Sequence, residues 1–124
     1  MKLKLQQIVN SEMSLKKLIE IKLPIKIAYK LSKLVNLIQP ELTIFTEQRD
    51  KLIRELGAED KDNNVKVTDE NLPKFMEELK KLTEIEIDLS FSDGKDIEKI
   101  KISDLGDISL EAQDLVLLNW LITE

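Results

Sequence analysis

The side chains in this sequence that are best suited to catalysis are carboxylates. The 124 residues include no histidine and no cysteine, so the commonest general base, the usual zinc ligands and the thiol nucleophile are missing. Paired carboxylates could act as acid and base or hold magnesium. Five aspartates cluster in the sequence: Asp93, Asp96, Asp104, Asp107 and Asp114. Because their spacing matches no catalytic motif and turn or capping roles account for them, we predict no catalytic residue and no enzymatic activity.

Phosphate-binding glycine motifs are missing, and a calcium motif is incomplete. The three glycines are too far apart for a GxxxxGKS/T loop, a GxGxxG fingerprint or a GxSxG elbow. Asp60, Asp62 and Asn64 match the first three ligand positions of a calcium-binding EF-hand loop. Val65 then replaces the required glycine, and Asn71 replaces the closing glutamate. We predict a solvated turn there, with no metal site and no cofactor.

Charge is distributed unevenly along the chain. Residues 1–56 contain eleven Lys/Arg and six Asp/Glu, whereas residues 57–124 contain eight and eighteen. This asymmetry allows three arrangements: the halves pack against each other, protomers pair head to tail, or the basic end binds an anionic ligand. Nucleic acid is disfavoured as the partner, because the total charge is negative and no recognised reading motif is present.

The candidate ligand-binding residues lie in the basic half: Lys22, Lys26, Tyr29, Lys30 and Lys33. Four of them, from residue 26 onward, follow three- and four-residue steps and so share one face of a helix. The tyrosine ring could stack on a small anionic, nucleotide-like ligand while the lysines neutralise its charge. The alternative is that these lysines form an ordinary solvated face.

Apolar periodicity predicts the elements that carry these residues. We expect one domain (1–124) with a predominantly helical α+β fold, divided into a basic helical half and an acidic half. Leu23-Pro24 separates a mostly helical first segment from a long central helix that ends at Gly57. Pro40 lies inside this helix and predicts a kink, or a break near Asn36–Gln39.

We predict that the acidic half contains a helix, a β-hairpin and a terminal helix. After a short extended piece at Val65–Val67, the helix runs to about Leu82. Residues 85–91 and 100–102 alternate apolar and charged side chains on either side of turn residues, which predicts an antiparallel hairpin. The terminal helix starts at a cap, Asp107 or Ser109, and continues through about Ile122.

The length of the central helix suggests self-association. A small monomer offers little surface against which to bury the whole apolar stripe of such a helix, so we expect a homo-oligomer. The expected contacts are Leu31, Leu34, Ile38, Phe45 and Trp120. The apolar C-terminal segment has a second interpretation, in which it is simply central to the fold.

Membrane insertion is not expected. No apolar run reaches the roughly 18 to 20 residues that span a bilayer, and the first residues lack the apolar region of a signal peptide. The lack of cysteine is compatible with a reducing compartment. We therefore expect the protein to stay in the cytoplasm.

Nearly the whole chain resembles a family of small proteins from phages and prophages of Gram-positive bacteria. The similar segments are Lys22–Lys33, Pro40–Leu42, Glu47–Ile53, the acidic turn after Gly57, Ile102–Leu105, Ile108–Ser109 and Asp114–Ile122. These segments are structural and include no catalytic residue, and the family has no settled activity. The resemblance implies a phage-encoded, cofactor-free binding protein that works in the host cytoplasm.

Three functions remain open at this stage. The first is an accessory protein that sequesters a host defence factor or an anionic signalling molecule and so counters host antiviral defence. The second is a structural or assembly protein of the virion. The third is a carboxylate-dependent enzyme, for which Asp104→Asn and Asp107→Asn would abolish activity.

Overall fold

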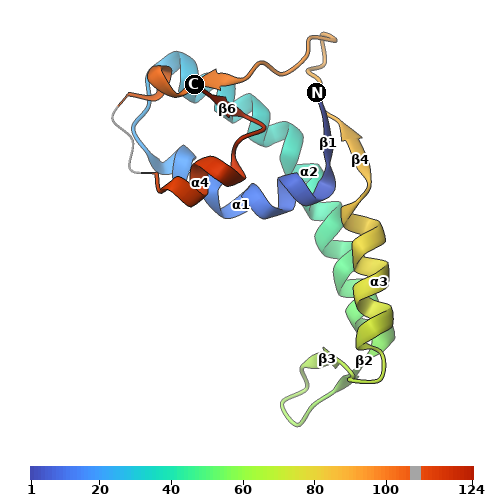
Figure 1. Cartoon of the computed structure of the whole chain (residues 1–124). Coiled ribbons are helices and arrows are strands. Elements are labelled where there is room, and N and C mark those ends of the chain that lie inside the picture. Colours follow the sequence, from blue (N-terminus) through green and yellow to red (C-terminus); the bar gives the residue numbers. More distant parts are fainter. Residues whose placement is uncertain (107–109) are drawn as a thin grey trace.

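The computed structural model describes residues 1–106 and 110–124 and confirms a mostly helical α+β fold (Figure 1). In the described residues, the strands are short and pair two at a time. The elements in chain order are β1 (Lys2–Lys4), α1 (Leu5–Glu20), α2 (Ile25–Leu56), β2 (Gly57–Glu59), β3 (Val65–Val67), α3 (Leu72–Thr83), β4 (Glu86–Asp88), β5 (Ile100–Lys101), a 3₁₀ helix (Ile102–Leu105), α4 (Ala112–Leu117) and β6 (Ile122–Thr123).

The long central helix is α2, and its predicted ends are confirmed. It starts directly after Pro24, whose carbonyl oxygen accepts hydrogen bonds from the Ile27 and Ala28 N–H groups, both at 3.0 Å. It ends at Gly57, where the chain becomes extended. The helix continues through Pro40, so of the two predicted alternatives the break near Asn36–Gln39 is wrong, and the kink stays a prediction. Buried side chains before and after the proline hold both parts of the helix against the core, which offsets the one missing backbone hydrogen bond.

The buried core draws on both halves of the chain. Its most deeply buried side chains include Ile8 and Leu18 from α1, Leu31 from α2, and Leu118 and Leu121 near the C-terminus. Each such side chain contributes roughly 1.5–3 kcal/mol when fully buried. The basic and acidic halves therefore pack against each other, which is one of the three arrangements that the charge asymmetry allowed.

The predicted hairpin between residues 85–91 and 100–102 is wrong in its pairing. β4 pairs with β1 in antiparallel register, with Leu3 opposite Ile87. β5 pairs with β6 in parallel register, with Ile100 opposite Ile122. Alternating side chains mark a segment as extended but do not identify its partner, and here the two ends of the chain supply the partners.

The turn predicted between those segments does form. The Phe91 N–H donates to the Lys95 carbonyl oxygen at 2.9 Å, and the Gly94 N–H donates to the Phe91 carbonyl oxygen at 2.8 Å. Gly94 has a φ of 82°, a left-handed conformation that glycine adopts readily. Beyond this turn, Ser90 and Asp96 form a single antiparallel bridge. The turn is therefore a tight loop on its own and does not join two long strands.

The predicted terminal helix is too long. α4 ends at Leu117, after which the chain turns and enters β6. Leu118, Trp120 and Leu121 are buried in this irregular segment, which explains why its sequence is apolar in every direction. The expected caps at residues 107 and 109 lie outside the described residues. α4 instead follows Glu111, whose N–H donates to the Asp114 carboxylate at 3.0 Å.

Residues 46–85 form a projection that we call the arm, and we call the remaining described residues the body. In Figure 1, α3 lies beside the second half of α2, and the pair extends away from the other helices toward the hairpin of β2 and β3. The structure describes every arm residue, and none of them is buried. Phe75, Leu79 and Leu82 of α3 are only half-buried. The arm thus lacks a core of its own.

Candidate functional site

Four of the five predicted ligand-binding residues line one hollow at the start of α2. Lys26, Tyr29, Lys30 and Lys33 are all exposed and border a cavity of about 530 Å³. Their three- and four-residue steps place them on one face of the helix, as the sequence predicted. The fifth residue, Lys22, lies in the link before Pro24 and does not border this cavity.

The other wall of this hollow comes from the turn between β4 and β5, which sequence reasoning missed as part of the site. The turn contributes Phe91, Asp93 and Lys95, and Ile25 completes the lining. Buried anchors on both sides, Leu89 and Ile97, tie the turn to the body. The turn-forming residues were visible in the sequence, but their position over the start of α2 depends on the pairing of β4 with β1.

The electrostatics of this cavity, which we call the basic hollow, favour an anion. Its lining includes four lysines, Lys26, Lys30, Lys33 and Lys95, and one carboxylate, Asp93. Within residues 1–106 and 110–124, none of these ammonium groups forms a salt bridge. The Asp93 carboxylate accepts the Lys95 N–H at 3.0 Å, so it also closes the turn. Like charges gathered around a cavity raise the local concentration of anions.

Lys33 lies close to two aromatic rings. Its Nζ is 5.2 Å from the centre of the Tyr29 ring and 5.5 Å from the centre of the Phe91 ring. A cation within about 6 Å of a ring centre is attracted by roughly 0.5–1 kcal/mol at an exposed site. These contacts keep an ammonium group and two ring faces together, an arrangement that suits a ligand with both a negative charge and a flat ring.

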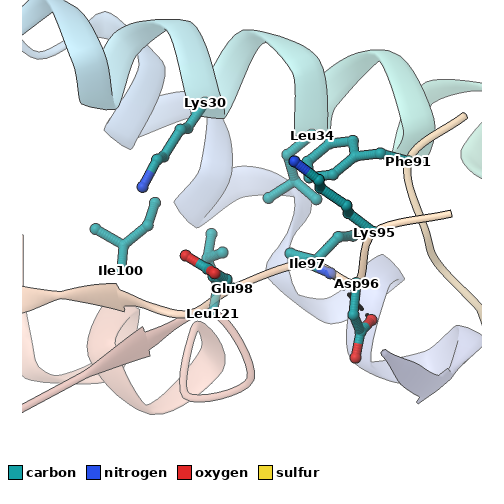
Figure 2. A pocket seen from close by; sticks show the side chains of 9 residues that line it. All are labelled: Lys30, Leu34, Phe91, Lys95, Asp96, Ile97, Glu98, Ile100 and Leu121. Carbon is teal, nitrogen blue, oxygen red and sulfur yellow. Dashed lines mark hydrogen bonds between the residues drawn. The ribbon is translucent and has the colours of Figure 1, made fainter. Parts of the chain in front are cut away.

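A second cavity of about 450 Å³ adjoins the first, and we call it the apolar hollow (Figure 2). It shares Lys30, Phe91 and Lys95 with the basic hollow and is further lined by Leu34, Asp96, Ile97, Glu98, Ile100 and Leu121. The four aliphatic side chains in this lining are buried, whereas both carboxylates are exposed. Figure 2 shows Lys30 and Leu34 on α2 facing the segment that leads into β5.

The carboxylates near the C-terminus have structural partners. Asp96 accepts hydrogen bonds from the Met1 amino group and from the Ile97 N–H, and these bonds hold the pKa of its carboxyl below the usual value. In Figure 2 the Asp96 carboxylate points away from the other labelled side chains. Asp104 is exposed in the 3₁₀ helix, and Asp107 lies outside the described residues. The hydrogen bonds of Asp96 thus join the N-terminus to the turn before β5.

Asp114 joins the C-terminal segment to α1 in a buried polar cluster. The Ser14 hydroxyl donates to Asp114 at 2.7 Å, and the Lys17 ammonium lies 3.2 Å from the same carboxylate. The Ser14 hydroxyl, the Glu111 N–H and the Lys17 ammonium hold the pKa of Asp114 below its ordinary value of 3.8. Nearby, the Trp120 indole N–H donates to the Ser11 hydroxyl at 3.3 Å. The cluster therefore positions the C-terminal segment, whose Leu121 lines the apolar hollow.

The residues chosen as self-association contacts lie inside one chain. Leu31, Leu34, Ile38, Phe45 and Trp120 are 1% to 7% exposed. The assumption behind that choice was wrong, because α1 covers part of the α2 stripe and α3 lies along another part. These side chains are not free to contact a second copy of the folded chain. Self-association stays a prediction, with no residues assigned to it.

In residues 1–106 and 110–124, no group of three or more metal-ligating side chains gathers at one point, and no helix combines the length and apolar character of a membrane span. The calcium-like loop is a turn in which Asp60 accepts the Asp62 N–H at 2.9 Å and the Asn64 N–H at 3.0 Å.

Comparison with protein-family models, with curated proteins and with solved structures gave no match to this chain. The resemblance to small phage proteins therefore stays a prediction. The geometry of the two hollows is the observation from which a function can be argued.

Proposed function

We propose that this protein is a non-enzymatic binder that captures a small anionic ligand with a flat ring in the basic hollow. The observation that carries the proposal is the meeting of four lysines from two segments, Lys26, Lys30, Lys33 and Lys95, with the rings of Tyr29 and Phe91. Lysine is a compact point charge that binds phosphate through its three donors. The Phe91 ring borders the adjoining apolar hollow as well and supplies an aromatic surface for a planar group, so one site recognises both parts of the ligand.

The size and exposure of the hollow agree with reversible binding. A cavity of about 530 Å³ lies within the range of roughly 300–1,000 Å³ that is usual for small-molecule sites. A charged hydrogen bond contributes roughly 1.5–3 kcal/mol, and screening by water reduces this at an exposed site. Several lysine contacts together with ring stacking are therefore needed for the roughly 8 kcal/mol of a micromolar complex.

We place this activity in a phage accessory protein that sequesters its ligand in the host cytoplasm and so counters host antiviral defence. Support comes from the resemblance to small phage proteins and from the lack of histidine and cysteine chemistry. Sequestration requires only affinity for the ligand. A chain of this size with no catalytic residue is therefore sufficient for this function. The sequestered molecule is an anionic signalling molecule or an anionic group on a host factor.

The arm favours a second candidate, a structural or assembly protein of the virion that acts through helix-mediated oligomerisation. On α3, Leu72 and Met76 are 46% and 56% exposed and lie one helical turn apart. Exposed apolar side chains on a projecting helix suit an assembly contact. Recovery of the chain in purified particles, and its loss from them after substitution of both residues by serine, would favour assembly over sequestration.

A binding assay with matched variants tests the main proposal. Calorimetric titration with ADP should show saturable binding to the wild type that weakens as salt rises, because exposed charges are screened. The variant Lys30→Ala/Lys33→Ala/Lys95→Ala should bind at least tenfold more weakly. The control Lys61→Ala/Lys74→Ala removes exposed lysines from the arm and should bind as the wild type does. An equal loss in both variants would contradict a site at the basic hollow.

A further inference from the structure

We infer that the ligand is a purine nucleotide whose base occupies the apolar hollow while its phosphates occupy the basic hollow. This inference rests on the proposed function and names the ligand class of the same site. Lys30, Phe91 and Lys95 border both cavities, so the two hollows share a wall. A ligand that lies across this wall contacts both hollows at once.

The charges of the two hollows determine which part of the ligand lies in which hollow. The basic hollow has four lysines and the single carboxylate Asp93. The apolar hollow has only the two shared lysines, Lys30 and Lys95, and Glu98 borders it as a counter-charge, whereas the Asp96 carboxylate points away and pairs with the Met1 amino group. An anionic group is therefore favoured in the basic hollow and an uncharged group in the apolar hollow.

The lining of the apolar hollow suits a flat apolar ring system. Leu34, Ile97, Ile100 and Leu121 are 1% to 7% exposed and form an aliphatic surface, and the Phe91 ring stands at the boundary. These four side chains come from α2, from the segment around β5 and from the C-terminal segment, so the folded core fixes their positions. A base placed there exchanges water contacts for aliphatic and aromatic contacts. A volume of about 450 Å³ accommodates two fused rings.

The Glu98 carboxylate determines which bases are favoured in the apolar hollow. Its side chain is exposed and borders the apolar hollow, and it forms no salt bridge within residues 1–106 and 110–124. An ionised carboxylate accepts hydrogen bonds and donates none. It therefore favours a base that presents N–H donors, such as the amino group of adenine or of guanine. Asp96 does not compete for this role, because it bonds the Met1 amino group and the Ile97 N–H.

Titration with three ligands of similar charge distinguishes purine-nucleotide binding from the general anion binding of the proposed function. ATP, UTP and tripolyphosphate are titrated separately into the wild type at one salt concentration. We expect ATP to bind at least tenfold more tightly than tripolyphosphate, with UTP between them. Equal binding of ATP and tripolyphosphate would overturn the purine inference and leave anion binding in place. No binding by any of the three would overturn both.

The position of the base is read from side-chain methyl signals in NMR spectra. Ring currents from ATP should shift the methyl signals of Ile97, Ile100 and Leu121, and tripolyphosphate should leave them in place. Glu98→Gln keeps the size of this exposed side chain and should reduce the preference for ATP over tripolyphosphate several-fold. Asp104→Asn, an exposed change outside both hollows, is the control and should leave the preference unchanged. Unshifted methyl signals, or an unchanged preference in Glu98→Gln, would overturn the inference.

Discussion

The body encloses side chains such as Ile8, Leu118 and Leu121, which are at most 1% exposed, whereas the arm has no buried side chain. In the body, segments from both ends of the chain cover each other, and buried hydrogen bonds join α1 to the C-terminal segment. In the arm, α2 is contacted by α3 and by the β2–β3 hairpin, and no side chain becomes buried between them. One helix therefore carries a well-packed start, which holds the site, and a sparsely packed end. Because local stability follows packing, we expect the body to be more resistant to local unfolding than the arm.

The largest effect on stability should come from removing a buried side chain from the core of the body. Leu118→Ala removes a side chain that is fully buried, and we expect it to lower the free energy of unfolding by about 2–5 kcal/mol. Leu79→Ala removes a half-buried side chain from the arm and should lower it by about 1 kcal/mol. Urea denaturation measures both. Equal losses would contradict the difference in packing between the two regions.

A smaller effect, with a defined pH dependence, should follow from Asp114→Asn. The pKa of Asp114 is lower in the folded chain than its ordinary value of 3.8, so the ionised carboxylate stabilises the fold above about pH 4. This stabilisation is lost as the pH falls through the lower folded pKa. We expect the variant to melt several degrees below the wild type at pH 7 and to approach it as the carboxylate of the folded wild type becomes protonated. Thermal melts across pH test this, and a constant difference would contradict it.

Gly57→Ala should affect the arm alone. A Cβ at this position would lie 2.4 Å from the Ile53 carbonyl oxygen and 2.6 Å from the Lys66 carbonyl oxygen, so the hairpin would have to move. We expect faster amide hydrogen exchange in β2, β3 and α3, with unchanged exchange in α1. Ala58→Ser, at the exposed neighbouring position, is the control. Faster exchange throughout α1 would show that the two regions unfold together.

The smallest effect on stability should come from the site itself. Lys30→Ala/Lys33→Ala removes two exposed ammonium groups of like charge together with the contacts of Lys33 with two rings. Because relief of repulsion offsets part of the lost contacts, we expect the free energy of unfolding to change by at most about 1 kcal/mol. Urea denaturation beside the ligand titration tests this expectation. A large loss of stability would mean that the lysines hold the fold together, so weak binding by the variant would no longer report on the site.

The sequence predicted the features that depend on local repeats. The start and end of α2 follow from Pro24 and Gly57, and the shared face of Lys26, Lys30 and Lys33 follows from helical periodicity. Such signals need only neighbouring residues and the geometry of one helix. They were therefore sufficient for the helical part of the fold and for one wall of the basic hollow.

The missed features depend on residues that are far apart in the chain. Leu3 pairs with Ile87 and Ile100 pairs with Ile122, and an alternating pattern cannot identify such partners. The same pairings place Phe91 and Lys95 over α2, so the second wall of the site could not be predicted. The apolar C-terminal segment was assigned to a helix because its pattern indicates burial, and burial alone does not specify helical structure.

Native mass spectrometry of the protein purified from bacteria that produce it tests the central claim most directly. We predict that the wild type retains a small anionic molecule that disappears on denaturation, and that Lys30→Ala/Lys33→Ala/Lys95→Ala purified in parallel retains none. The mass of the retained molecule would identify it. A wild type that shows no bound molecule even when ADP is added before the measurement, or the same molecule retained equally by the triple variant, would contradict a ligand site at the basic hollow.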